Sequence, residues 1–157
     1  MIRPELLENI ETPALIIDMD IVHANLKEYH DAVHSCGVDI RPHTKTHKIP
    51  ELARLQIEQY GAKGIAVAKT SEAEVMADAG IDDIFVAYPI VGKGKIERLA
   101  VLNRKMDRLL VSFDSLFAAK QFSEIAVQFG KPFKIIADVD VVDMGRAGFK
   151  LETAVDE

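Results

Sequence analysis

Short apolar runs alternate with helical patterns along this chain, and no other feature restricts its fold as much. Each run is nearly continuous in apolar residues, as expected of strands that are buried on both faces of a sheet. The runs span residues 14–18, 38–42, 64–68, 83–88, 108–113 and 133–139. The alternation predicts an α/β fold with a parallel sheet.

The intervening stretches carry helix start and stop signals. Helices are expected over residues 20–35, 50–60, 72–79, 93–105 and 115–129. A glycine follows four of them, as is common at helix ends. The run Ser71-Glu72-Ala73-Glu74 matches a capping box, and Ser115 is the expected N-cap of the last helix. Without a repeat or linker, residues 1–157 form one unbroken β/α array.

The number of β/α units leaves two architectures open. Five or six units suit a doubly wound sheet, whereas a closed (β/α)8 TIM-type barrel needs roughly 200 residues or more. The chain has 157 residues, and its last seven have the pattern of opening helical turns. The expectation is therefore a portion of a longer protein.

Composition excludes several classes of protein. With 48% hydrophobic residues the chain has the apolar content of a globular domain, and a formal charge of −6 argues against a nucleic-acid partner. No apolar run is long enough to span a bilayer. The single Cys36 cannot form an internal disulfide, and the N-terminal residues lack a signal-peptide pattern, so a cytoplasmic location is expected.

A dense block of basic residues follows the second predicted strand. Five of its eight residues are potentially cationic, in the order Arg41-Pro42-His43-Thr44-Lys45-Thr46-His47-Lys48. Neighbouring cations disfavour a further ammonium ion, so the block predicts a neutral, nucleophilic amine at Lys45. His43 and His47 lack a carboxylate at metalloprotease spacing, and hydrogen-bonding roles are favoured over metal ligation.

Other polar residues follow the remaining strands, where α/β folds place ligands. They are Lys69 with Thr70, Tyr88 with Pro89, Asp114 and, in a glycine-flanked turn, Arg146. For Tyr88, pocket lining and core packing are equally favoured. Asp114 has the alternative of helping to cap the next helix, and His23, His30 and His34 are expected on a solvated helix face.

Four motifs, in order, resemble the N-terminal part of the D-threonine aldolase and D-serine dehydratase family. They are the segment of residues 12–18, the block of residues 41–48, the helix start at residues 71–74 and the turn at residues 144–148. This resemblance implies an alanine racemase-like pyridoxal-phosphate barrel, of which residues 1–157 are the N-terminal part. It also implies that Lys45 holds pyridoxal phosphate as a Schiff base and that Arg146 binds its phenolic oxygen, with His43 and Tyr88 as further cofactor contacts.

The resemblance also implies parts that lie outside this sequence. A C-terminal β domain would carry the ligands of a divalent metal, so no metal ligand is assigned here. An intact enzyme is expected to be a homodimer with a small amino-acid substrate. The implied activity is that of a lyase acting on D-β-hydroxy amino acids, either an aldolase or a dehydratase.

Three alternatives stay open at this point. One is an amino-acid racemase of the alanine racemase type. Another is a protein or fragment that binds pyridoxal phosphate without turnover. A third is a free-standing doubly wound sheet that binds a small molecule, with Lys45 incidental.

Overall fold

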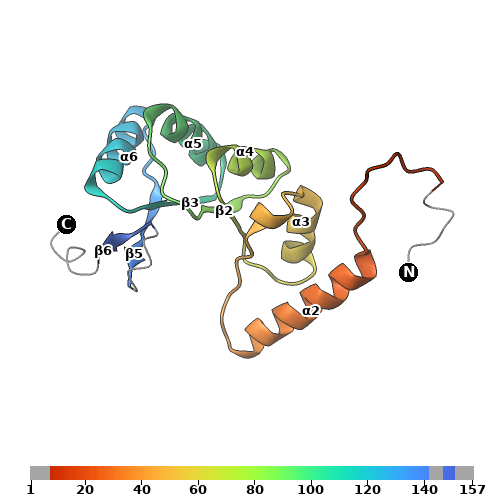
Figure 1. Ribbon diagram of the computed structural model, residues 1–157. Coiled ribbons are helices and arrows are strands. Elements are labelled where there is room, and N and C mark those ends of the chain that lie inside the picture. Colours follow the sequence, from red (N-terminus) through yellow and green to blue (C-terminus); the bar gives the residue numbers. More distant parts are fainter. Residues whose placement is uncertain (1–7, 142–146, 151–157) are drawn as a thin grey trace.

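Four helices and a parallel sheet follow the N-terminal helix in the order expected from the sequence (Figure 1). The computed structural model describes residues 8–141 and 147–150. The helices are α2 (Met19–Ser35), α3 (Pro50–Glu58), α4 (Thr70–Asp78), α5 (Lys93–Lys105) and α6 (Leu116–Phe129). A short 3-10 helix, η1 (Thr44–Thr46), lies between α2 and α3. All five predicted helices are thus confirmed, with small shifts at their ends.

The main sheet is parallel throughout. Its strands are β1 (Ile65–Val67), β2 (Asp83–Val86), β3 (Arg108–Phe113) and β4 (Lys134–Ala137), and they pair in the order β1-β2-β3-β4. Each consecutive pair is connected through a helix, which is the β/α arrangement predicted from the alternation. A separate short ribbon pairs β5 (Val139–Asp140) with β6 (Phe149–Lys150).

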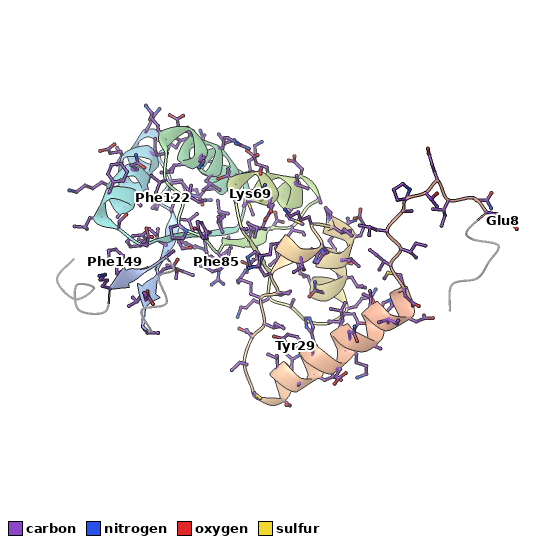
Figure 2. All side chains as sticks on the ribbon, viewed as in Figure 1. Glu8, Tyr29, Lys69, Phe85, Phe122 and Phe149 are labelled. Atoms are coloured by element: carbon purple, nitrogen blue, oxygen red, sulfur yellow. The ribbon has the colours of Figure 1, made fainter. Side chains whose placement is uncertain are left out.

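The core lies between the sheet and the layer formed by α4, α5 and α6 (Figure 1). Ile84 and Val86 of β2 are completely buried there, and Phe85 between them is only partly buried. Successive side chains of a strand point to opposite faces, so Phe85 belongs to the face away from these helices (Figure 2). Full burial of one such aliphatic side chain stabilises the fold by about 1.5–3 kcal/mol.

Local signals explain how the helices begin and end. The carboxylate of Asp18 accepts hydrogen bonds from the backbone N–H groups of Asp20 and Ile21, at 3.1 and 3.3 Å, and so starts α2. Ser115 caps α6 as predicted, and Gly130 ends it with a left-handed backbone at φ +70°. By contrast, the capping box predicted at Ser71 is wrong. Helix α4 already begins at Thr70, and its N-cap residue Lys69 makes no side-chain capping bond.

Two predicted strands are not strands in the structure. Residues 14–18 have no neighbouring strand to pair with in the described part of the chain, and Leu15 is fully exposed. Residues 38–42 run beside β1 but make only scattered contacts with it. Ile40 O accepts from the N–H of Lys63 at 3.0 Å, and Pro42 O accepts from that of Ala66 at 2.8 Å. Since proline has no N–H to donate, the ladder cannot continue through Pro42.

Among the described residues, none of the helices combines the length and the hydropathy that crossing a bilayer requires.

Candidate functional site

The basic block of residues 41–48 forms a loop that leaves the sheet beside β1. His43 makes an isolated parallel bridge with Ala66, and the hydroxyl of Thr44 donates to the carbonyl of Ala66 at 3.2 Å. Thr44 is completely buried, so this hydrogen bond fixes the start of η1 against the middle of β1. The loop therefore has a defined position at the carboxyl end of the sheet.

Lys45 is the amine that this loop presents. Its side chain is exposed, and among the described residues its ammonium group makes no hydrogen bond or salt bridge. The other strong cations of the block are paired. Arg41 binds Asp83 at 2.6 Å, and Lys48 lies 3.1 Å from a carboxylate oxygen of Glu72. The crowding of positive charge expected from the sequence is thus largely relieved, and a neutral amine at Lys45 stays a prediction.

The imidazole of His43 adjoins Lys45 through the backbone. Its Nδ1 atom accepts a hydrogen bond from the N–H of Lys45 at 3.2 Å. Burial lowers the pKa of His43, the positive charge of Lys45 lowers it further, and the carboxylate of Glu72 opposes this shift. A neutral ring is therefore favoured near pH 7, in keeping with Nδ1 acting as an acceptor.

His47 has a similar role at the other end of the loop. Its Nδ1 atom accepts from the N–H of Ile49 at 3.0 Å, and burial lowers its pKa. Its Nε2 atom is buried without a hydrogen-bond partner in the described structure. Both histidines thus serve as hydrogen-bond acceptors within the loop. Within the described ranges no three potential ligands are grouped in a way that could hold a metal ion.

Glu72 is a site residue that the sequence interpretation did not identify. It was expected only as part of a capping box, but its carboxylate is buried and accepts from the N–H of Ala68 at 2.8 Å. Burial alone raises the pKa of Glu72. The Ala68 hydrogen bond and the ammonium of Lys48 outweigh it and bring the pKa below its ordinary value. No local signal was available, because Glu72 lies within the first turn of α4 and its partner Lys48 belongs to a distant part of the chain.

Other predicted residues also lie where the strands end. Lys69 precedes α4 directly after β1 (Figure 2), and Tyr88 follows β2 with 58% of its side chain exposed. That exposure excludes core packing for Tyr88, so pocket lining stays a prediction. Asp114 precedes the capping residue of α6. Arg146, the predicted partner of the phenolic oxygen, lies outside the described residues.

Asp138, at the end of β4, has a pKa above its ordinary value. Burial raises the pKa of Asp138, the nearby side chain of Ser112 opposes this, and the charge of Asp114 raises the pKa again. Ser112 is itself completely buried, and its hydroxyl donates to the carbonyl of Val86 at 3.0 Å. The ends of β2, β3 and β4 are thus linked by polar contacts.

One of the three histidines of the first predicted helix is not on a solvated face, contrary to the expectation. His30 is buried rather than solvated, and its Nδ1 atom lies 2.8 Å from the carbonyl oxygen of Tyr60. His23 contacts the hydroxyl of the same tyrosine at 2.6 Å. These contacts attach α2 to the end of α3. Helix periodicity alone could not reveal them, because Tyr60 lies 37 positions from His23 and 30 from His30 in the chain.

An apolar cavity of about 200 Å³ lies at another place in the fold, between α6 and the strands β3 and β4. Its lining is aromatic and aliphatic, with Phe122 (Figure 2), Phe133 and Ile135 among the contributing side chains. None of the cofactor contacts predicted from the sequence lines it. We therefore place the candidate site at the loop of Lys45 and not in this cavity.

Comparison with known proteins supports the family and the fold. The model of the alanine racemase N-terminal domain matches residues 17–157. A D-threonine aldolase from Arthrobacter sp is 36% identical over 142 residues, which is 90% of this chain and 37% of that protein. A D-serine dehydratase from Dictyostelium discoideum is 29% identical, over 85% of this chain and 35% of its own length.

A solved structure of a similar protein has the same fold as this chain. The crystal structure of D-threonine aldolase from Filomicrobium marinum superposes with a TM-score of 0.88 at 34% identity, covering 96% of this chain and 40% of that one. This confirms the predicted α/β fold class, and the parallel sheet corresponds to the N-terminal barrel domain of alanine racemase-like proteins. The chain spans well under half of the length of these relatives.

Proposed function

This chain belongs to the family of alanine racemase N-terminal domains, and from that premise we propose that it acts as a pyridoxal-phosphate-dependent lyase on D-β-hydroxy amino acids. Related members of the family are pyridoxal-phosphate-dependent aldolases and dehydratases. The two relatives are named after D-threonine and D-serine, and both of these D-amino acids carry a hydroxyl group on Cβ. Lys45 is the residue proposed to carry the chemistry.

One observation carries this proposal. Of the three strong cations in the block of residues 41–48, Arg41 and Lys48 are held by carboxylates, and only Lys45 is without a partner in the described structure. An exposed primary amine without an ion-pair partner can meet an aldehyde, whereas an ammonium held by a carboxylate cannot attack one. The donor chemistry at Lys45 therefore fits pyridoxal phosphate.

The residues of this chain have distinct parts in the proposed reaction. Bound pyridoxal phosphate supplies an electron sink that weakens bonds at the substrate Cα. The Nζ atom of Lys45 would hold the cofactor, and its amine would hold and return a proton at the substrate Cα. The neutral ring of His43 orients the backbone N–H of Lys45. Arg146 and Tyr88 remain proposed cofactor contacts.

Two outcomes of the lyase reaction are compatible with these residues. Cleavage of the Cα–Cβ bond gives glycine and an aldehyde, whereas loss of water gives a 2-oxo acid and ammonia. The position of a divalent metal near the substrate hydroxyl would decide between cleavage and loss of water. The ligands of this metal are proposed to lie in a further domain of an intact enzyme. An intact enzyme is also proposed to form a homodimer. An alanine racemase-type activity is the runner-up, since the domain model that matches this chain carries that name.

Product analysis tests the proposal directly. The protein is incubated with pyridoxal phosphate, a divalent metal and either D-threonine or D-serine, and glycine, aldehyde, 2-oxo acid and D-to-L conversion are measured. We expect products from the D-enantiomers only, and none from Lys45→Ala. The matched control is Lys95→Ala, which removes an exposed lysine of α5. Cofactor binding without products would favour a non-catalytic carrier, and conversion to the L-enantiomer would favour a racemase.

A further inference from the structure

Glu72 is a buried carboxylate that joins two separate parts of the fold. One of its oxygens accepts from the N–H of Ala68, just after β1, at 2.8 Å. The other lies 3.1 Å from the ammonium of Lys48, in the loop. Its side chain is only 8% exposed, whereas that of Lys48 is 56% exposed. A carboxylate removed from water in this way is stabilised by its two partners, and losing either is costly.

Lys48 has an unusual backbone that depends on local support. Its φ of +57° lies in the left-handed region, which non-glycine residues seldom adopt. Its N–H donates to the carbonyl of Thr44 at 2.7 Å, which closes the turn around Lys45. A strained residue of this kind persists only where its surroundings hold it, and the ion pair with Glu72 is such a support.

The loop is thus held at both of its ends. At the start, Thr44 is buried and bonded to Ala66 of β1. At the far end, Lys48 is bonded to Glu72 of α4. Lys45 lies between these two attachments. Its ammonium group has no hydrogen bond or ion pair among the described residues, whereas its backbone N–H donates to Nδ1 of His43 at 3.2 Å. The backbone position of Lys45 is therefore set by the contacts of His43, Thr44 and Lys48.

We propose that Glu72 is the positioning residue of Lys45 and acts through Lys48. It closes the loop by holding Lys48, and it keeps the Lys48 amine engaged so that Lys45 is the amine of the block that reacts with an aldehyde. This proposal rests on the proposed role of Lys45. Three charged or titratable groups face Glu72, namely Lys48, Lys69 and the ring of His43, and of these only Lys48 forms an ion pair with it.

Chemical labelling of the protein without cofactor tests the selectivity. A small amine-acylating reagent is added briefly, and the extent of modification at each lysine is read by peptide mass spectrometry. In the unaltered protein Lys45 should be modified faster than Lys48. In Glu72→Gln the modification of Lys48 should rise about two- to fivefold, because an ion pair with a half-exposed lysine has that order of effect. Glu74→Gln is the matched control, since Glu74 lies on the same helix and pairs with Arg98.

Amide hydrogen exchange of residues 43–48 tests the closure of the loop. Exchange should be several-fold faster in Glu72→Gln and in Lys48→Gln, and the double variant should be no faster than the more affected single variant, since both remove one contact. Lys48→Arg keeps a cation and should restore slow exchange. The ratio of exchange rates between variant and unaltered protein should be the same at pH 7 and pH 8, because the Glu72 carboxylate is ionised and the rings of His43 and His47 are neutral over that range.

The outcomes separate this inference from the proposed function. If Lys48→Gln leaves both the loop exchange and the reactivity of Lys45 unchanged, Glu72 only bonds the N–H of Ala68 and the inference is overturned. If labelling and exchange change as expected but pyridoxal phosphate never attaches to Lys45, the positioning is upheld and the cofactor role fails. Melting temperatures of all variants show that each one is folded.

Discussion

The two ends of the parallel sheet hold their charges in different ways. At the amino end, Asp83 of β2 receives a two-pronged hydrogen bond from Arg41, at 2.6 and 3.1 Å, and lies 4.0 Å from Arg108 at the start of β3. At the carboxyl end, Lys48 and Glu72 share a single contact, and Lys45 has no ion pair in the described structure. The amino end fastens neighbouring segments together, whereas the carboxyl end leaves the Lys45 amine without an ion pair among the described residues.

This difference shows why a cluster of like charges in a sequence is a poor guide to local charge. Arg41 and Lys45 are four positions apart, yet their side chains belong to opposite ends of the sheet. Arg41 is paired with Asp83 at the amino end, and Lys48, the other strong cation of the block, is paired with Glu72. In α/β folds ligands bind at the carboxyl ends of the strands, whereas residues at the amino ends contribute to the stability of the fold. The following substitutions test this division.

The largest effect is expected from Gly64→Ala at the amino end. A Cβ atom at Gly64 would lie 2.4 Å from a guanidinium nitrogen of Arg41 and 2.5 Å from the carbonyl oxygen of Asp83. Overpacking of this kind costs about 1–3 kcal/mol of the free energy of unfolding, which urea denaturation measures. The control is Gly94→Ala in α5, where nothing lies within 4 Å. An equal loss in both variants would contradict the close approach at Gly64.

A smaller loss is expected from Asp83→Asn. The substitution keeps the shape of the side chain but leaves the half-buried Arg41 without its counter-charge, at a cost of about 1–2 kcal/mol. Asp39→Asn removes the exposed pair with Lys63 and should leave the free energy of unfolding almost unchanged. Similar losses in the two variants would mean that the amino end is no more firmly held than an ordinary surface.

The smallest effect concerns the pH dependence of stability at the carboxyl end. Burial lowers the pKa of His47 in the folded protein, so the unfolded chain binds this proton more readily below pH 6.5. The free energy of unfolding should therefore fall as the pH drops through 6.5 toward the lower folded pKa. His47→Asn keeps an acceptor for the N–H of Ile49 and should weaken this dependence. Parallel stability curves for the two proteins would contradict the buried, neutral ring.

Local patterns in the sequence predicted much of this fold. Ser115 and Gly130 bound α6 as expected, because capping depends on nearby residues alone. The sites that escaped prediction depend on partners far along the chain. His30 is buried because Tyr60, distant in the sequence, lies beside it. The missing ladder of residues 38–42 is an exception with a local cause, since Pro42 has no N–H to donate. Glu72 was assigned to a helix cap, although its carboxylate faces Lys48 instead.

Attachment of pyridoxal phosphate to Lys45 is the central claim, and trapping it chemically is the most direct test. The protein is incubated with limiting cofactor, reduced with borohydride and digested, and the cofactor mass is quantified on every lysine peptide. We expect the mass on Lys45 far above that on Lys48 or Lys69, together with loss of the visible absorption band on reduction. An even distribution over exposed lysines, or unchanged trapping in Lys45→Arg, would contradict the account.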